Sequence, residues 1–160
     1  MVVLLMGVTG SGKTTTGRLL ARELEWEFAD ADSFHPAANV EKMRLGIPLD
    51  DADRAPWLEA LRVAITGYIA ENKNVVLACS ALKRAYRESL LVGPQVRLVY
   101  LKGSFEMMAV RLRERRGHFA DERILAGQFR DLQEPEAAVV VDAGARPEQI
   151  VLQIRKSLGL

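Results

Sequence analysis

The sequence is poor in cysteine, in aromatic residues and in net charge of either sign. Cys79 is the only cysteine in 160 residues, which excludes an internal disulfide and is typical of the reducing cytoplasm. Lysine and arginine number 22 against 21 aspartate and glutamate, and aromatic residues make up 6%. These values do not favour a basic, aromatic-rich surface for nucleic acid. No apolar run approaches the roughly 20 residues of a membrane span, so we expect neither nucleic acid nor a membrane as partner.

Other absences concern the organisation of the chain. There are no repeats or low-complexity tracts, and the length predicts one domain over residues 1–160. Two histidines and one cysteine provide no zinc signature. The apolar residues 2–6 are too few for the core of a signal peptide, so we expect a first strand there and a cytoplasmic protein. Cys79 lies in another apolar run and is predicted to be a buried structural thiol.

Residues 7–14, Gly-Val-Thr-Gly-Ser-Gly-Lys-Thr, fit the phosphate-binding pattern G-x-x-x-x-G-K-[ST] between a strand and a helix. Glycines let backbone N–H groups approach phosphate oxygens, and the helix amino terminus adds positive potential. We expect Lys13 to reach the β- and γ-phosphates and the Thr14 hydroxyl to bind Mg²⁺. The alternative is a glycine-rich turn that only caps a helix. The predicted nucleotide-binding residues are Gly7, Val8, Thr9, Gly10, Ser11, Gly12, Lys13, Thr14 and Thr15.

Short apolar runs alternate with helical patterns along the chain. The alternation predicts an α/β fold, a doubly wound parallel sheet of five strands with helices on both faces and ligands at the carboxyl ends of the strands. Residues 33–72 are expected to form a substrate-binding insertion with two helices, and residues 116–123 a lid. Strands are expected at 2–6, 26–29, 75–79, 96–101 and 138–141, and other helices at 13–25, 57–71, 81–91, 104–115, 122–132 and 147–157.

Asp30 and Asp32 lie at the end of the second expected strand. Residues i and i+2 of an extended chain point the same way, so both carboxylates are expected to face the phosphate loop. Phosphoryl transfer needs a group that accepts the proton of the attacking hydroxyl and groups that support Mg²⁺. We assign Asp32 to the hydroxyl and Asp30 to the metal through water. The alternative is that one or both aspartates cap a helix that starts near Pro36, a role that Asp32 or Ser33 could fill.

The following segment resembles the gluconokinase family, whose pattern is close to H-P-x-x-N-x-x-K-M-x-x-G-x-P-L-x-D-x-D-R-x-P-W-L. Further stretches similar to the family are residues 79–83 with Tyr86-Arg87, residues 100–103, and residues 117–119 leading to Gln128-Phe129 and residues 132–135. The first segment matches at His35, Pro36, Asn39, Lys42, Met43, Gly46, Pro48, Leu49, Asp51, Asp53, Arg54, Pro56, Trp57 and Leu58.

The resemblance implies a P-loop NTPase of the nucleoside-monophosphate-kinase type with strand order 2-3-1-4-5 and a lid. It also implies a homodimer that uses ATP and Mg²⁺ to phosphorylate D-gluconate at its 6-hydroxyl. A sugar acid needs a guanidinium for its carboxylate and polar groups for its hydroxyls. From the matched motifs we expect contacts from Asp32, Lys42, Arg54, Ser80, Arg87 and Gln128.

Several of these residues also have structural interpretations. Arg54 lies before the helix whose first turn carries Pro56 and has three aspartates nearby to pair with. Arg87 is alternatively a solvated residue on a basic helix face. Trp57 and Met43 are more typical of a core than of ligand contacts, and His35 is interpreted as a structural residue where the loop meets the helix.

Arginines cluster before the expected lid. Arg111 and Arg115 are spaced i, i+4 and share a helix face. Related kinases imply that Arg111 stacks on adenine and that Arg115, a catalytic residue with Lys13 and Asp32, contacts the transferring phosphate. Arg146 is a weaker candidate on the other side of adenine. The alternative is a solvated basic face paired with glutamates 106 and 114.

Three rival functions remain open at this point. One is a kinase of the same fold for another acceptor, such as shikimate or a nucleoside monophosphate. Another is a nucleotide-dependent switch, although Asn72-Lys73-Asn74-Val75 lacks the aspartate of N-K-x-D and precedes its strand. A nucleic-acid-binding domain is disfavoured by the near-neutral charge.

Overall fold

A single five-stranded parallel sheet organises the chain, as the strand pattern predicts. The computed structural model describes the backbone of residues 1–116 and 120–160 and the side chains of residues 1–114 and 122–160. The sheet order is β2-β3-β1-β4-β5, the order that the family resemblance implies. All neighbouring strands are parallel, and Leu5 of the central strand lies opposite Ala78 and Val99. The strands are β1 Val2–Met6, β2 Glu27–Asp30, β3 Val75–Ala78, β4 Val96–Lys102 and β5 Val139–Asp142.

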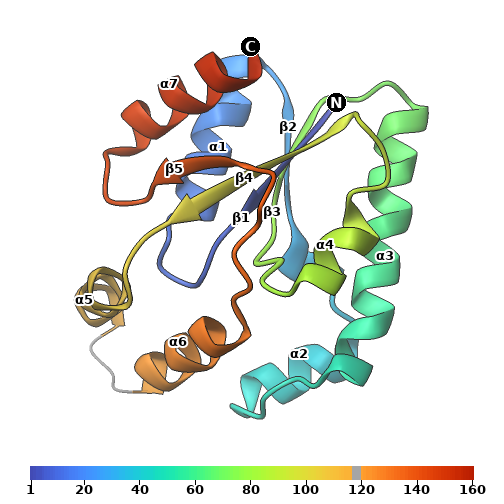
Figure 1. Cartoon of the computed structure of the whole chain (residues 1–160). Coiled ribbons are helices and arrows are strands. Elements are labelled where there is room, and N and C mark those ends of the chain that lie inside the picture. Colours follow the sequence, from blue (N-terminus) through green and yellow to red (C-terminus); the bar gives the residue numbers. More distant parts are fainter. Residues whose placement is uncertain (117–119) are drawn as a thin grey trace.

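Helices cover both faces of the sheet (Figure 1). Helices α1 (Lys13–Leu24) and α7 (Pro147–Leu158) pack together on one face, and α3 (Asp51–Ala70) and α4 (Arg84–Leu90) on the other. The remaining helices lie beyond the carboxyl ends of the strands, where the ligand site of such a sheet is expected. They are α2 Ala37–Arg44, α5 Phe105–Arg116 and α6 Ala120–Asp131, with a short 3-10 turn, η1, over Ala31–Phe34.

Two apolar clusters, one on each face of the sheet, form the core. Residues 2–6 are completely buried and alternate between the clusters, with Leu5 packed on the α1 side and Leu4 on the α3 side. A parallel strand covered on both faces has no polar side, which explains the uninterrupted apolar runs. Cys79 is buried as predicted, and burial raises the pKa of its thiol to about 12, so it stays protonated and unreactive.

The start of α3 differs from the sequence-based prediction. The helix begins at Asp51, not at Trp57. Asp50 is its N-cap, because its Oδ1 accepts from the Asp53 backbone N–H at 2.7 Å while Asp53 Oδ2 accepts from the Asp50 N–H at 3.1 Å. This reciprocal capping box sets the helix start, and Pro56 therefore lies inside the helix. The prediction wrongly took Pro56 to mark the first turn.

The start of α4 is also later than predicted. The expected helix began at residue 81, but Ala81 has φ 45°, in the left-handed region that an alanine rarely adopts. The chain turns there, and the helix begins at Arg84.

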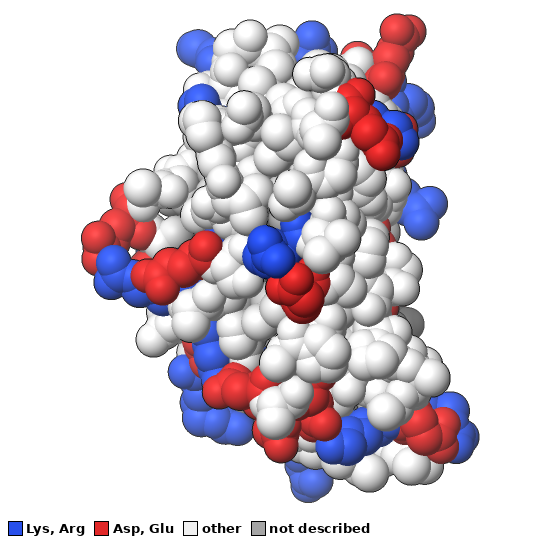
Figure 2. Space-filling view, turned by 90° about the vertical axis from the view of Figure 1, so that its right-hand side faces the viewer, with Lys and Arg blue, Asp and Glu red and all other residues white. Residues whose placement is uncertain are grey.

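The described surface carries both signs of charge. On the face over α3 and α4, lysine and arginine are interspersed with aspartate and glutamate and form no single-sign field (Figure 2). Within the described residues, no helix combines the length and the apolar character that crossing a bilayer requires.

Candidate functional site

The phosphate loop connects β1 to α1 and adopts a conformation that depends on its glycines. Gly10 and Gly12 have φ values of 79° and 90°, in the left-handed region. A Cβ on Gly7 would lie 2.6 Å from Ser11 Oγ and 3.0 Å from the Leu101 carbonyl oxygen. The loop is therefore shaped by backbone freedom and close packing, a conformation in which backbone N–H groups can approach an anion closely.

Lys13 lies across this loop as the first residue of α1. Its Nζ donates to the Val8 carbonyl at 3.0 Å. Burial lowers the pKa of the ammonium, while the nearby Asp32 and Asp30 act in the opposite direction. A partly buried cation held at the loop and near two carboxylates is suited to neutralise charge on a transferring phosphoryl group.

A hollow of about 280 Å³ opens beside the loop. Arg111 crosses its wall and donates to the carbonyl oxygens of Ala143, at 2.6 Å, and Gly10, at 3.3 Å. The arginine thus joins the phosphate loop to the segment after β5, and its position fits the base-stacking role predicted for it. The lining residues are Ser11, Gly12, Thr15, Thr16, Arg111, Glu114, Ala143, Ala145, Pro147 and Ile150. This size and lining fit a nucleoside next to a phosphate site.

The other predicted nucleotide-side arginines differ in how far the structure describes them. Arg146 is exposed between Ala145 and Pro147, which line the hollow, but does not line it itself. The side chain of Arg115 lies outside the described residues. Arg113 pairs with Glu122 of α6, so for this residue the alternative pairing with glutamates 106 and 114 is wrong.

Thr14 and Asp30 place two oxygen ligands at the mouth of the loop. Thr14 Oγ1 donates to Asp30 Oδ2 at 3.4 Å. Hydroxyl and carboxylate oxygens are the ligands that Mg²⁺ prefers, and this ion typically takes one or two protein ligands with substrate phosphates and water. Among the described residues there is no group of three or more histidine, cysteine, aspartate or glutamate side chains that could hold a metal. The residues present therefore fit a magnesium ion shared with a nucleotide.

Asp32 follows directly from Asp30 in the η1 turn. Asp30 Oδ1 accepts from the Asp32 backbone N–H at 3.0 Å, whereas the Asp32 carboxylate accepts no hydrogen bond within the described part of the chain. Burial and, next, the charge of Asp30 raise the pKa of Asp32. The alternative capping role at α2 is wrong, because the N-cap of α2 is Pro36 and Ser33 Oγ instead donates to the Asp30 carbonyl. Asp30 does act as a cap, but of the η1 turn.

Several of the residues predicted to hold the sugar acid are engaged by protein partners. Lys42 Nζ forms an ion pair with the Asp53 carboxylate at 2.8 Å. Arg54 does not pair with the neighbouring aspartates. Its Nη1 donates to Tyr86 Oη at 3.2 Å and lies 4.0 Å from Asp131 Oδ2. Arg54 is thus the more available guanidinium of the acceptor side.

The alternative interpretation of Arg87 as a solvated residue on a basic helix face is wrong, because the side chain is buried. The side chain is 5% exposed, and Nη1 donates to the carbonyl oxygens of Ala81, at 3.0 Å, and Leu82, at 2.9 Å. Burial lowers its pKa, and no carboxylate pairs with it among the described residues. Ser80, in the same loop, accepts at its carbonyl from the Gly7 N–H at 3.4 Å. Arg87 therefore supports the loop that meets the phosphate loop.

Gln128 reaches the phosphate loop from α6. Its Oε1 accepts from the Thr9 backbone N–H at 2.6 Å. This residue was predicted on the acceptor side, and the structure brings it to the tip of the nucleotide loop. Trp57 is buried as expected, whereas Met43, expected in the core, is 43% exposed.

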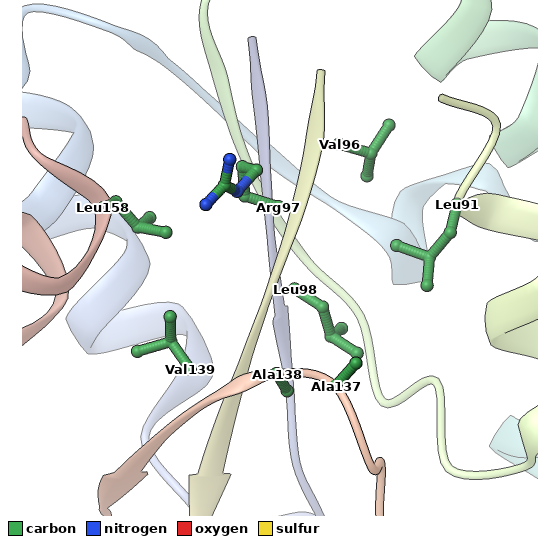
Figure 3. A pocket seen from close by; sticks show the side chains of 8 residues that line it. All are labelled: Leu91, Val96, Arg97, Leu98, Ala137, Ala138, Val139 and Leu158. Carbon is green, nitrogen blue, oxygen red and sulfur yellow. The ribbon is translucent and has the colours of Figure 1, made fainter. Parts of the chain in front are cut away.

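A second hollow, at the amino ends of β4 and β5, is not lined by the phosphate-binding and carboxylate groups of the first site (Figure 3). It has a volume of about 280 Å³ and is apolar apart from Arg97. It contains neither a carboxylate nor a nucleophile, and it lies at the strand ends opposite to the phosphate loop.

Comparison with known proteins agrees with this geometry. A family model described as shikimate kinase matches residues 9–158. The thermoresistant gluconokinase of Escherichia coli is 43% identical over 94% of this chain and 89% of that protein, and a probable gluconokinase of Xenopus tropicalis is 44% identical over 86% and 80%. The crystal structure of a gluconokinase from Sinorhizobium meliloti superposes with a TM-score of 0.87 at 37% identity, covering 99% of this chain and 91% of that one.

The chain belongs to the gluconokinase family. The fold is that of the P-loop kinases, with the sheet order of the structure above.

Some residues of this gluconokinase-family site were not assigned a role from the sequence. Gln133 Oε1 accepts from the Arg84 N–H at 2.7 Å and caps α4, and its backbone N–H donates to the Leu82 carbonyl. Tyr86 donates to Asp51, which also accepts from Lys83 at 2.8 Å. The sequence contains the signal, because residues 79–83 with Tyr86-Arg87 and residues 132–135 resemble family motifs, but the contacts between these motifs follow only from the fold.

Proposed function

We propose that the protein is a gluconokinase that transfers the γ-phosphoryl group of ATP to the 6-hydroxyl of D-gluconate. The observation that carries the proposal is the Asp32 carboxylate, which lies near Lys13 of the phosphate loop and just before the gluconokinase-like segment that begins at His35, and which accepts no hydrogen bond from the described residues. A free carboxylate next to the donor site is what an alcohol acceptor requires, because it orients the hydroxyl and takes its proton.

The donor side binds ATP through the loop N–H groups and Lys13, with Arg111 beside the base. Thr14 and, through water, Asp30 would hold Mg²⁺, which supplies positive charge to the β- and γ-phosphate oxygens when bound. Lys13 holds its charge at the transferring group and stabilises the charge that develops there. Arg115 is proposed to add a second positive charge.

On the acceptor side, Asp32 accepts the proton of the 6-hydroxyl as that oxygen attacks the γ-phosphorus. The new P–O bond forms while the bond to the bridging β–γ oxygen breaks, so the products are 6-phosphogluconate and ADP. Arg54 is proposed to bind the gluconate carboxylate, supported by its weak engagement with protein partners. Lys42, Ser80, Arg87 and Gln128 stay predictions as acceptor contacts.

Larger parts of the chain have roles that we also propose. Residues 33–72 serve as the acceptor-binding insertion and residues 116–123 as a lid that excludes water as a competing acceptor. The protein is proposed to work as a homodimer in the cytoplasm, and sedimentation of the purified protein tests the assembly.

An acceptor panel tests the function. ADP release is coupled to a spectrophotometric readout with gluconate, shikimate, nucleoside monophosphates and no acceptor. We expect release that depends on gluconate and little release with the other acceptors. Slow release that no acceptor stimulates would instead support a nucleotide-dependent switch and refute the kinase proposal.

A further inference from the structure

The imidazole of His35 is fixed in one plane at the edge of the acceptor region. His35 follows η1 and precedes α2, and its ring stacks on Trp57 with ring centroids 4.6 Å apart and an angle of 9° between planes. Trp57 is buried, and its Nε1–H donates to the Ala31 carbonyl at 2.7 Å. A ring stacked on an anchored indole has little freedom to rotate.

The hydrogen bonds of Asn39 also fix the tautomer of His35. Asn39 is buried, and its Nδ2 donates to the Asp53 carbonyl oxygen at 2.7 Å, a contact that only the amide nitrogen can make. The same Nδ2 lies 3.2 Å from His35 Nδ1. An amide nitrogen donates and does not accept, so Nδ1 must be the accepting nitrogen. The proton of the neutral imidazole is therefore on Nε2.

The ring is also kept neutral. Burial lowers the pKa of His35, and the positive charge of Arg54 lowers it further, against the opposing effect of Asp32. Protonation of Nδ1 would break the bond from Asn39. The charged groups that act on this imidazole are thus Asp32 and Arg54, which lie on the acceptor side of the site.

The Nε2–H donor has no partner in the described part of the protein. Among the described residues, the completely buried side-chain polar atoms that lack a hydrogen bond are Ser11 Oγ and Arg155 Nε. His35 Nε2 is not one of them, so it is accessible to solvent or to a ligand. An oriented neutral donor near a carboxylate and a guanidinium is suited to an uncharged hydroxyl oxygen.

We propose that His35 is a positioning and specificity residue whose Nε2–H donates to a hydroxyl oxygen of the acceptor, next to the hydroxyl that Asp32 deprotonates. The proposal rests on the proposed function and assigns His35 a ligand contact, where the sequence indicated only a structural residue. Because the donor is neutral and fixed, it selects acceptors that carry a hydroxyl at that point without attracting anions to it.

Substitutions of His35 distinguish the contribution of its Nε2–H donor from that of its aromatic ring. His35→Phe keeps an aromatic ring for Trp57 but removes the N–H, whereas His35→Gln returns an N–H near the Nε2 position. For His35→Phe we expect KM for gluconate to rise about 3- to 10-fold, the effect of one neutral hydrogen bond, with KM for ATP unchanged. His35→Gln should recover most of the loss. His35→Asn, which is too short to reach the ligand, should not. Gln153→Ala, on the exposed face of α7, is the matched control.

A spectroscopic measurement tests the tautomer without activity. In ¹⁵N–¹H spectra of the full chain, whose two histidines are assigned with the His35 variants, His35 should show a protonated Nε2 and an unprotonated Nδ1 that both respond to gluconate. A proton on Nδ1, or an unchanged gluconate KM in His35→Phe, would overturn the proposal. If wild-type protein releases no gluconate-dependent ADP while the tautomer is as expected, the proposed function fails and not the geometry of His35.

Discussion

The phosphate loop and the acceptor side of the site are built in different ways. The loop is one contiguous segment, residues 7–14, shaped by glycines and short backbone contacts such as Ser11 N–H to the Val8 carbonyl at 3.2 Å. The acceptor side is assembled by side chains from separate elements, including the Lys42–Asp53 ion pair and the Arg54–Tyr86 hydrogen bond. A local pattern can specify the first, whereas the second depends on how the chain folds. Variants of the two sides should therefore affect the two substrates separately.

Asp32→Asn is expected to show the largest difference between its effects on the acceptor side and on the donor side. Loss of the group that accepts the hydroxyl proton should lower kcat about 1000-fold, since general bases contribute between about 10² and 10⁴. ATP affinity, measured by calorimetry, should stay within about twofold because the loop and Lys13 are untouched. Near-normal turnover would remove Asp32 from the base role, and weakened ATP binding would show that the two sides are not separable.

Lys13→Met should affect the donor side. We expect kcat/KM for ATP to fall about 10²- to 10³-fold through the loss of one charged donor at the transferring phosphate. Folding should be retained, because the substitution removes a buried charge whose pKa burial already lowers. Direct titration with gluconate, followed by the His35 resonances, should give wild-type affinity. A folded variant with wild-type kcat/KM for ATP would contradict the assignment.

Arg54 and Arg87 distinguish a ligand contact from a structural one. Arg54→Ala should raise KM for gluconate about 10- to 100-fold, the effect of a hydrogen bond to a charged group, with KM for ATP unchanged. Arg87→Ala should mainly lower the free energy of unfolding, because its Nη1 holds the carbonyls of Ala81 and Leu82. Urea unfolding and steady-state kinetics measure both effects. If Arg87→Ala instead raised KM for gluconate and Arg54→Ala mainly lowered the free energy of unfolding, Arg87 would be the carboxylate-binding residue.

Glycine substitutions compare the packing of the two sides. Gly7→Ala should cost about 2–3 kcal/mol in urea unfolding, since its Cβ would contact Ser11 Oγ at 2.6 Å and the Leu101 carbonyl oxygen at 3.0 Å. Gly46 also has a positive φ, 70°, but no atom lies within 4 Å of its Cβ position. Gly46→Ala should thus cost only about 1 kcal/mol. Equal losses in the free energy of unfolding for the two variants would show that backbone conformation, and not packing, determines the cost of Gly7→Ala.

The smallest effect is a change in the titration of His35. Its pKa is lowered by burial and by Arg54 and raised by Asp32, so NMR titration should place it below that of an unhindered histidine. Arg54→Ala should move this pKa up and Asp32→Asn should move it down. Since the neutral form is favoured in the folded protein, its contribution to stability is lost as pH falls through the ordinary histidine range. Shifts of the opposite sign would contradict the arrangement of these three residues.

The fold was largely predictable because its signals are local. The phosphate loop, the five strands and the thiol of Cys79 follow from pattern and apolar runs, and the strand order from the family motifs. The start of α3 was not predictable in this way, because Asp50 and Asp53 form a capping box within a segment that has the composition of a polar loop.

The contacts of the site were less predictable because they join distant segments. Gln128 and Thr9 are separated by 119 residues, and only the packing of α6 brings them together. The buried Arg87 donates to the carbonyl of Ala81, whose left-handed conformation residue type alone does not indicate. Residue types therefore predict an acceptor side, and the fold decides which of its charges are already paired.

The central claim, transfer to the primary 6-hydroxyl of gluconate, is tested most directly by proton-coupled ³¹P NMR of the product. A phosphate ester at a CH₂ group couples to two protons, so the account predicts one triplet that grows in step with ADP. Inorganic phosphate alone would mean hydrolysis, and a doublet would mean transfer to a secondary hydroxyl; either result would contradict the account.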